Sequence, residues 1–226
     1  MAHWLDTVFY GFDYAILEAI HSFALSTNGF FTPLVRAITV LADDGIGMIL
    51  LGLILSLFRR TRKIGFCVLG GIMVGALITN VAVKNLVARP RPFADQTRVF
   101  YEWWQAIGAH PESIHSFPSG HTTATMAAMT GIFLTTKKRY SWPALLFAPV
   151  MGFTRMYLVV HYPTDIIGGL LSGGIGALCA YLILRAVWRY IEAHPDRKLF
   201  SLILTFDLAA FLSKHLRRGK KADGEQ

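Results

Sequence analysis

Long apolar runs constrain the fold of this chain more than any other feature of its sequence. A helix that spans a lipid bilayer needs about 20 mostly apolar residues. Runs of this kind occur at residues 45–58, which is short, and at 64–83, 119–136, 142–160 and 164–191. Because 54% of the 226 residues are hydrophobic and only 16% are charged, the composition lies outside the range of soluble globular proteins. The sequence therefore predicts an all-α integral membrane protein.

Two shorter apolar runs, at 13–25 and 30–42, lie on either side of the polar stretch "STNG". We expect the first to lie as a helix in the membrane interface and the second to form a shallow first crossing, which completes a bundle of six transmembrane helices. The N-terminus carries Asp6, Asp13 and Glu18 and has no basic segment before its apolar run, so no cleavable signal peptide is expected.

Lysines and arginines cluster where apolar runs end. The clusters are "RRTRK" at 59–63, "KKR" at 137–139 and "RRGKK" at 217–221. By the positive-inside rule they face the cytoplasm, so the connections at the other ends of the helices face outward. Those connections are the turn at 42–45, the long loop 85–117 and the turn at 161–165. The sequence thus predicts a multi-pass protein of the cytoplasmic (inner) membrane whose polar site lies on the extracytoplasmic side.

The net charge of +8 raises nucleic-acid binding as an alternative, but the basic clusters are short and stand where topology signals belong, so no nucleic-acid partner is expected. One membrane domain is predicted for residues 1–194, followed by a tail at 195–226 whose apolar run is interrupted by Asp207. This tail is expected to form an amphipathic helix on the cytoplasmic leaflet, with its last ten residues either helical or disordered. Cys67 and Cys179 fall in separate apolar runs and are expected to be packing residues. The oligomeric state stays open.

Three polar blocks stand at the outer ends of these helices. They are "VKNLVARPRP" at 83–92, "FPSGHT" at 117–122 and "FTRMYLVVHYPTD" at 153–165. A single Lys or Arg at a helix end is usually an anchor that extends to the interface, which is the ordinary interpretation of Lys84, Arg89 and Arg91. Arg155 differs because it precedes His161 by six residues and so lies roughly 9 Å inside the crossing. A charge at that depth needs an anionic partner, from the protein or from a ligand.

The second block has the composition of a helix start, with Pro118 favouring the first turn and Ser119 as the cap. The N-terminus of a helix also presents free N–H groups and the positive end of its dipole, which together bind anions. Gly120 allows an anion to approach the backbone closely. With the cations of the other two blocks on the same face, this arrangement predicts a phosphate-like ligand.

Two histidines face the same cluster of cations. Asp165 follows His161 by four residues and can accept the proton of one ring nitrogen, which leaves a lone pair on the other and prepares a nucleophile. His121, on another helix, is a candidate acid for a leaving oxygen. One histidine on an apolar helix is more often a core residue, but two on one cationic cluster favour catalysis. His110 and His115 lie near the site without an acidic residue at ligand spacing, so no metal site is predicted.

The three blocks resemble the type 2 phosphatidic acid phosphatase superfamily of membrane lipid phosphatases, which shares its site with vanadium haloperoxidases and bacterial acid phosphatases. The family pattern is Lys, six residues, Arg-Pro; then Pro-Ser-Gly-His; then Ser-Arg, five residues, His, three residues, Asp. The matching residues are Lys84, Arg91 and Pro92, then Pro118 to His121, then Arg155, His161 and Asp165. One position departs from the pattern: Thr154 stands in place of Ser and keeps a hydroxyl.

The resemblance implies a metal-independent phosphatase without a cofactor. His161 would attack phosphorus to give a phosphohistidine, Asp165 would orient it, and His121 would protonate the leaving group and then activate water. The groups implied to hold the phosphate oxygens are Lys84, Arg91, Ser119, Gly120 and Arg155. Such chemistry depends mainly on positioning and charge stabilisation, which agrees with a cluster of fixed cations.

The motifs recognise only the phosphate, so several substrates stay open. Size and topology resemble most the enzymes that convert undecaprenyl diphosphate to undecaprenyl phosphate, with phosphatidylglycerol phosphate and phosphatidic acid as alternatives. A phosphotransferase, in which a lipid or sugar hydroxyl accepts the phosphoryl group, uses the same residues. A non-catalytic lipid-phosphate binder or transporter needs the cations but not the pair of His161 and Asp165. Trp103 and Trp104 in the outer loop are either a lid over the headgroups or part of an aromatic belt.

Overall fold

The computed structural model describes residues 1–40 and 45–214. Within these two ranges the chain is all-helical, and its strand-like pairing is limited to an isolated bridge between Pro90 and His115. Most of the predicted turn at 42–45 and the whole basic cluster at 217–221 lie outside the described residues.

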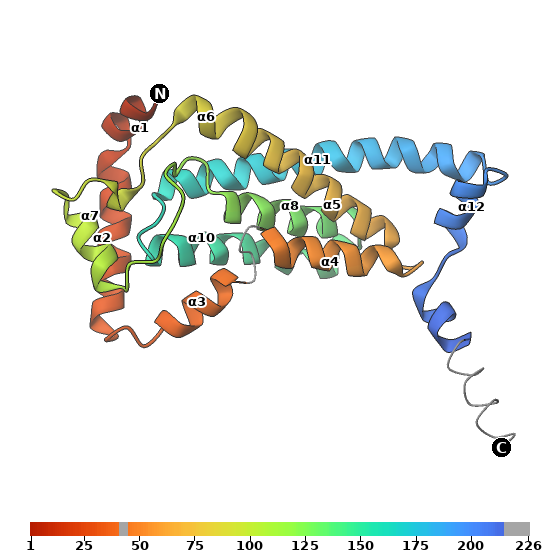
Figure 1. The fold of residues 1–226 in the computed structure, drawn as a ribbon, viewed down its shortest axis with the longest axis horizontal. Helices are drawn as coiled ribbons and strands as arrows, with labels where there is room; N and C mark the ends of the chain where they lie inside the picture. The colour runs from red at the N-terminus through yellow and green to blue at the C-terminus, as the bar shows by residue number, and fades with distance from the viewer. Residues whose placement is uncertain (41–44, 215–226) are drawn as a thin grey trace, which may run out of the picture.

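A bundle of helices runs along the long axis of the molecule (Figure 1). Its members are α4 (Ile46–Leu57), α5 (Arg62–Ala76), α8 (Gly120–Thr135), α10 (Phe147–Tyr157) and α11 (Pro163–Ala193). A π-helical segment, η2 (Leu77–Val83), and α6 (Lys84–Val87) continue α5 without a break, and the 3₁₀ segment η4 (Trp142–Leu146) leads into α10. Each long apolar run predicted from the sequence therefore forms a helix.

Small residues bring the central helices α5, α8 and α11 into close contact. A Cβ atom on Gly173 would lie 2.4 Å from the backbone oxygen of Thr123, and one on Gly169 would lie 2.8 Å from that of Ser119. Only glycine tolerates such an approach, and stripes of small residues are the usual interface between helices in membranes. The N-terminus of α11 is thereby fixed beside the N-terminus of α8.

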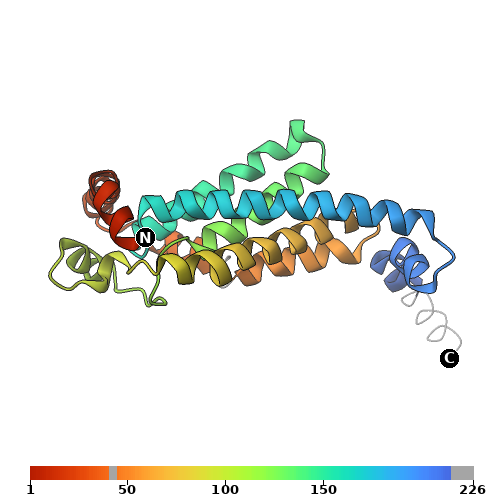
Figure 2. The ribbon, with the colours of Figure 1, turned by 90° about the horizontal axis from the view of Figure 1, so that it is seen from above.

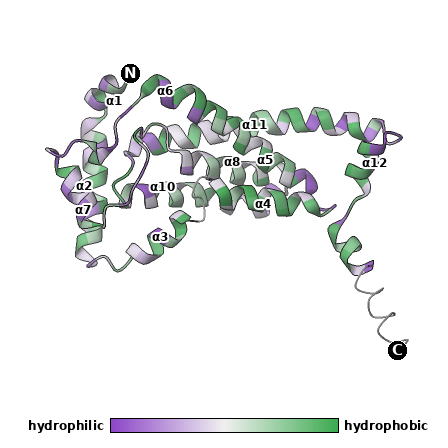
Figure 3. Ribbon diagram, in the orientation of Figure 1, coloured by the Kyte–Doolittle hydropathy of each residue, from purple (hydrophilic) through white to green (hydrophobic). Residues whose placement is uncertain are grey.

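Two helices are long and apolar enough to cross a membrane: Arg62–Val87 and Pro163–Ala193. Hydrophobic residues predominate on α4, on α5 and along most of α11 (Figure 3). Exposed apolar side chains on these helices include Leu53, Met73 and Leu171. The predicted all-helical character is thus confirmed over the described residues, and two helices are candidates for membrane crossings by their length and composition, while the six-helix membrane bundle stays a prediction.

The predicted first crossing at 30–42 is too short in its described part. Its helix, α3, covers Thr32–Val40, and nine residues rise only about 14 Å, less than half of the hydrocarbon thickness of about 30 Å. The described part of α3 is therefore shorter than a full crossing, and the expected shallow first crossing at 30–42 stays a prediction.

The N-terminal helices lie across one end of the bundle. α2 (Tyr10–Ser26) runs across the end of the bundle in Figure 1 and is seen nearly end-on in Figure 2, and the short α1 (Ala2–Val8) precedes it. α7 (Val99–Ala106), from the long outer loop after the short 3₁₀ segment η3 (Pro92–Ala94), lies at the same end (Figure 1). A helix in this orientation is suited to the membrane interface, as the sequence predicts for residues 13–25.

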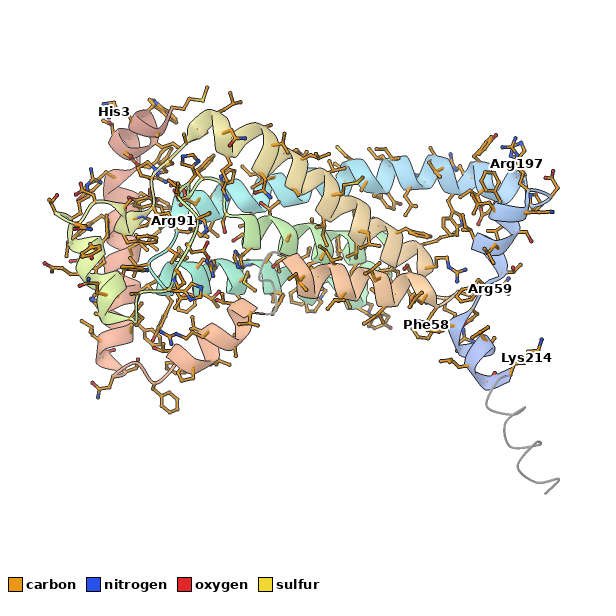
Figure 4. The ribbon with its side chains drawn as sticks, in the orientation of Figure 1. His3, Phe58, Arg59, Arg91, Arg197 and Lys214 are labelled. Atoms are coloured by element: carbon orange, nitrogen blue, oxygen red, sulfur yellow. The ribbon has the colours of Figure 1, made fainter. Side chains whose placement is uncertain are left out.

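The opposite end of the molecule carries basic residues. Arg59, Arg197 and Lys214 lie there, far from Arg91 (Figure 4). The basic α9 (Lys138–Ser141) follows the C-terminal end of α8, so it is separated from Gly120 by the length of that helix. α12 (Lys198–Thr205) begins the tail, and the helix breaks at residues 206–207, next to the predicted interruption. The buried Arg62 donates to the carbonyl oxygens of Ile203, at 2.6 Å, and of Phe206, which attaches this part of the tail to α5.

Candidate active site

A polar cavity of about 150 Å³ lies at the end of the bundle that carries Arg91. The predicted site residues that line it are Lys84, Arg91, Gly120, His121 and His161. They come from all three polar blocks, so the structure brings together segments that are far apart in the sequence. Asn80, Glu112 and Ser113 line the same cavity without having been predicted.

His161 and Asp165 form the predicted pair. The imidazole Nδ1 lies 3.3 Å from the carboxylate Oδ2, and both side chains are buried. The same Oδ2 accepts the backbone N–H of Tyr162 at 2.8 Å, which caps α11 and fixes the carboxylate. With the proton on Nδ1, the lone pair is on Nε2, which lies 3.1 Å from Nη1 of Arg91, and His161 is among the residues that line the cavity.

The environment of His161 favours its neutral form. Burial lowers the pKa of this imidazole well below 6.5, and the positive charges of Arg91 and Arg155 lower it further. Because only the neutral ring carries a lone pair, the site keeps the nucleophile ready at neutral and mildly acidic pH.

Arg91 reaches from the outer loop into the same cavity. Its Nη1 donates to the carbonyl of Val160 at 2.7 Å and contacts His161 Nε2 at 3.1 Å. Its Nη2 contacts Glu112 Oε2 at 3.1 Å and Ser113 Oγ at 3.0 Å, and its Nε donates to the carbonyl of Ser113. Burial lowers the pKa of this guanidinium to about 10, so it stays charged at neutral pH.

Arg155 lies in the last turn of α10, inside the bundle, and is fully buried. Its anionic partner is Glu112, whose Oε1 contacts Nη2 of Arg155. The prediction that an arginine at this depth needs an anion is therefore confirmed, and the protein supplies one. The neighbouring Thr154 accepts a hydrogen bond from the hydroxyl of Thr39 at 3.1 Å. Thr154 is the one residue that departs from the family pattern, and it lies where α10 contacts α3.

Ser119 caps α8. Its Oγ accepts from the N–H of Thr122 at 3.4 Å and from that residue's hydroxyl at 3.0 Å. Its own N–H donates to the carbonyl oxygen of Asp165 at 3.1 Å, which ties the start of α8 to the start of α11. Ser119 thus lies behind the cavity wall formed by Gly120 and His121, and its hydroxyl serves the cap.

The π-helical segment η2 sets the position of Lys84. π-Turns inside α-helices are often found at functional sites, because the extra residue turns the following side chains to a new direction. Asn80 within η2 and Lys84 directly after it both line the cavity. Ala88 then ends the helix in a left-handed conformation with φ of 48°, and the chain turns toward Arg91.

The buried position of Arg89 was not predicted from the sequence, which indicated only an anchor at a helix end. It is buried, and its three nitrogens contact Asp6 at 2.8 Å, Asp13 at 2.8 Å and Asp165 at 2.9 Å. Its guanidinium also lies 3.8 Å from the ring centre of Tyr162. Asp13 could have indicated such a buried cation from the sequence, because a carboxylate inside an apolar run needs a partner when it is buried.

Other residues considered in the sequence lie around the site. Trp104 stacks on Phe93 at 4.5 Å and donates to the carbonyl of His110 at 2.9 Å, while Trp103 stacks on His21 at 4.7 Å. Both indoles thus pack within the outer layer of helices and are not among the residues that line the cavity. Over the described ranges, no group of three or more His, Cys, Asp or Glu side chains has the arrangement of a metal site.

Residues 65–191, more than half of the chain, match the family model described as the PAP2 superfamily. The chain belongs to the PAP2 superfamily. All three polar blocks fall inside the matched region, as do His121 and His161, whereas α1 to α4 lie before it. Arg89, Arg91 and Glu112 lie inside it as well.

Two similar proteins are named as phosphatases of polyprenyl-linked phosphates. Undecaprenyl-diphosphatase BcrC of Bacillus subtilis is 29% identical over 159 residues, which cover 70% of this chain and 77% of that protein. Decaprenylphosphoryl-5-phosphoribose phosphatase of Mycolicibacterium smegmatis is 29% identical over 155 residues, 69% of this chain and 79% of that protein. Family membership and these relatives identify the chain as a PAP2 phosphatase.

The fold also resembles a solved structure, LpxE of Aquifex aeolicus. The superposition has a TM-score of 0.52 at 22% sequence identity and covers 70% of this chain and 91% of that one. The resemblance supports the arrangement of the helices.

Proposed function

We propose that this PAP2 protein is a metal-independent lipid phosphatase that converts undecaprenyl diphosphate to undecaprenyl phosphate through a phosphohistidine. The observation that carries the proposal is the geometry of His161. Its Nδ1 lies next to Asp165, its Nε2 lies next to Arg91, and the residue lines a cavity together with Lys84, Arg91 and His121. A lone pair next to fixed positive charge is what attack on an anionic phosphorus needs.

The first step is an attack of Nε2 on the terminal phosphorus. An N–P bond forms while the P–O bond to the leaving group breaks, and His121 in its protonated form transfers a proton to the departing oxygen. Asp165 stabilises the positive charge that develops on the ring of His161. Lys84, Arg91, Arg155 and the N-terminus of α8 at Gly120 stabilise the charge on the equatorial oxygens. Ser119 supports this group as the cap of that helix.

In the second step His121, now neutral, accepts a proton from water. The water oxygen forms a P–O bond as the N–P bond breaks, which releases inorganic phosphate and restores both histidines. The fixed cations supply the charge stabilisation that magnesium supplies in many phosphoryl-transfer enzymes, so the proposed reaction uses no metal ion.

The membrane placement belongs to the same proposal. We infer that the cavity lies at the outer surface of the cytoplasmic membrane, because the basic clusters at 59–63 and 137–139 lie at the opposite end of the bundle. A headgroup then enters the cavity while its polyprenyl tail stays in the bilayer beside the apolar helices. The lipid names of two relatives, both with polyprenyl chains, support a substrate of this kind.

Phosphate release by the purified protein tests the proposal. The substrates to compare are undecaprenyl diphosphate, a polyprenylphosphoryl phosphoribose that carries a terminal phosphate, phosphatidylglycerol phosphate and phosphatidic acid. We expect the diphosphate to be hydrolysed with the highest kcat/KM and His161→Ala to abolish turnover with every substrate. Formation of a phosphorylated acceptor lipid in place of free phosphate would identify a phosphotransferase. Lipid binding without phosphate release by the native protein would show that the protein only binds the lipid, and unchanged phosphate release by His161→Ala would refute the proposed nucleophile.

A further inference from the structure

The carboxylate of Glu112 lies between the two arginines that are proposed to bind the phosphate. Its Oε2 is 3.1 Å from Nη2 of Arg91, and its Oε1 contacts Nη2 of Arg155. The side chain is only 13% exposed and lines the cavity together with His121 and His161. Glu112 belongs to none of the three motifs, and the proposed reaction assigns it no step.

A carboxylate in this position has the chemistry of the proposed ligand. Carboxylates and phosphates both bind guanidinium groups through pairs of anionic oxygens, with similar hydrogen-bond geometry. Two oxygens that each contact one arginine reproduce two of the contacts expected from the oxygens of a phosphoryl group. The difference is charge, because a carboxylate carries one negative charge and a terminal phosphate carries up to about two.

The carboxylate of Glu112 and a bound phosphate need the same N–H donors of Arg91. A guanidinium has five N–H donors. In Arg91 three of its contacts go to Glu112 and Ser113, and the remaining two go to Val160 and His161. A phosphate can bind Arg91 only when one of these partners leaves. The side chains of Glu112 and Ser113 can leave without displacing the backbone or the nucleophile, and of these two only Glu112 is an anion that competes with phosphate for the charge of Arg91.

The backbone on either side of Glu112 is held in place. The carbonyl of His110 accepts from the indole of Trp104 at 2.9 Å, and the N–H of Ser116 donates to the carbonyl of Arg89 at 2.8 Å. Glu112 therefore lies on a short segment with two fixed ends, close to the arginines. Rotation of the side chain is enough to move its carboxylate away from the two arginines and to bring it back.

We propose that Glu112 is a built-in phosphate mimic that competes with ligands for Arg91 and Arg155 and thereby determines the affinity of the site. This inference rests on the proposed function, because it takes both arginines as phosphate ligands. A site that is competent for only a fraction of the time binds its ligand more weakly by that fraction. If the carboxylate holds the arginines for about nine-tenths of the time, the apparent Kd for phosphate is about tenfold higher than without it.

Two consequences follow for the reaction. The product, inorganic phosphate, is displaced by the returning carboxylate, so it does not accumulate in the site. Ligands with a single negative charge have no advantage over Glu112, whereas a terminal dianionic phosphate does, so the carboxylate selects phosphate monoesters and diphosphates over phosphodiesters. Glu112 thus acts on specificity and product release, while the chemical step stays with the histidines.

The test compares Glu112→Gln with Glu102→Gln in the full-length protein. Glu102 is an exposed acidic residue of α7 at the same end of the molecule, so its substitution removes the same charge without touching the arginines. The ligands are inorganic phosphate and orthovanadate. Their apparent Kd is measured from the ligand-dependent shift of the thermal unfolding midpoint, and their inhibition constants from lipid phosphate hydrolysis.

We expect Glu112→Gln to bind phosphate and vanadate about tenfold more tightly than the native protein, with Glu102→Gln unchanged. Equal or weaker binding by Glu112→Gln overturns the inference, and so does an equal gain in both variants, which would show a general effect of charge. If native protein and Glu112→Gln both fail to bind phosphate and vanadate, the proposed function fails together with the inference. Binding by the native protein without a gain in Glu112→Gln refutes the inference alone.

Discussion

Arg89 and Asp165 form a buried ion pair in which Nη1 of the guanidinium lies 2.9 Å from Oδ1 of the carboxylate, while the other oxygen, Oδ2, faces His161. Both side chains are at most 1% exposed. Asp13, from the crosswise helix α2, binds the same guanidinium at 2.8 Å and also accepts from the N–H and the hydroxyl of Thr164. The N-terminal helix is thus connected through Arg89 to the carboxylate that orients the proposed nucleophile.

Replacement of Arg89 is expected to destabilise the protein strongly. Arg89→Met leaves Asp13 and Asp165 as buried carboxylates without their cation, and the removal of one partner from a buried pair costs about 3–5 kcal/mol. Turnover should fall with stability, because Asp165 loses the contact that fixes it. Arg98→Met is the matched control, since Arg98 pairs with Asp95 on the surface and both are more than 40% exposed. Equal unfolding midpoints of the two variants would contradict the role of Arg89.

His121 is expected to act as the acid for the leaving group. His121→Gln should lower kcat about 10²- to 10⁴-fold for a lipid phosphate, because an alkoxide leaves poorly without a proton. The loss should be much smaller for an aryl phosphate whose leaving group is already acidic. His115→Gln, a neighbour in the loop without an assigned role, should leave both rates near those of the native protein. An equal loss with both substrates would exclude an acid role for His121.

The pH dependence of kcat/KM is expected to report the lowered pKa of His161. The neutral ring is the active form, and its pKa in the folded protein lies well below 6.5 because of burial and the charges of Arg91 and Arg155. As the pH falls, activity is therefore retained through 6.5 and lost only when the pH passes through this lower value. The measurement is a pH profile of kcat/KM between about 4 and 8. An acid limb centred at or above 6.5 would be inconsistent with a buried neutral nucleophile.

Chelation and vanadate are expected to have opposite effects on activity. Because fixed cations stabilise the transferred phosphoryl group in the proposed mechanism, activity should persist in EDTA. Vanadate imitates five-coordinate phosphorus and should inhibit as a competitor of the lipid phosphate. Assays of phosphate release with each reagent give the answer, and complete loss of activity with a chelator would refute metal independence.

Labelling of single introduced cysteines is expected to establish the orientation in the membrane. Ile114→Cys, at a position that is 81% exposed in the outer loop, should react in intact cells with a maleimide that does not cross membranes. Arg60→Cys, in the exposed turn between α4 and α5, should react only after permeabilisation. Both variants are best made in a Cys67→Ser, Cys179→Ser background. The reverse pattern would place the cavity on the cytoplasmic side.

The helices and most of the cavity wall were predictable from the sequence because they depend on local patterns. Hydrophobic length fixes where helices form, and α4, α5, α8, α10 and α11 occupy the predicted runs. The spacing from Lys84 to Arg91 and from His161 to Asp165 belongs to single segments, so the cavity contains the expected histidines and cations. The run at 30–42 contains the helix α3, whose nine described residues are shorter than a full span, so the expected shallow crossing there stays a prediction.

The contacts that complete the site were not predictable, because they join residues distant in the chain. Glu112 and Arg155 are 43 positions apart, and Asp13 and Arg89 are 76 positions apart. A charge that looks like an ordinary surface or interface residue in the sequence becomes a buried partner only when another helix covers it. Ser119 has a contact that its motif did not predict, because its hydroxyl oxygen accepts from the N–H and the hydroxyl of Thr122 in the helix cap, while its expected contact with phosphate stays a prediction.

The sequence by itself determined that this chain is helical and apolar, that three polar blocks share one end, and which histidines and cations carry the proposed chemistry. Only the tertiary structure decided how those groups are held: Arg89 on Asp165, Glu112 on Arg91 and Arg155, and α8 against α11 through Gly169 and Gly173. The physical reason is the distance along the chain between the residues that interact. Helix formation and motif spacing are local, whereas the partners of a buried charge depend on which helices pack together.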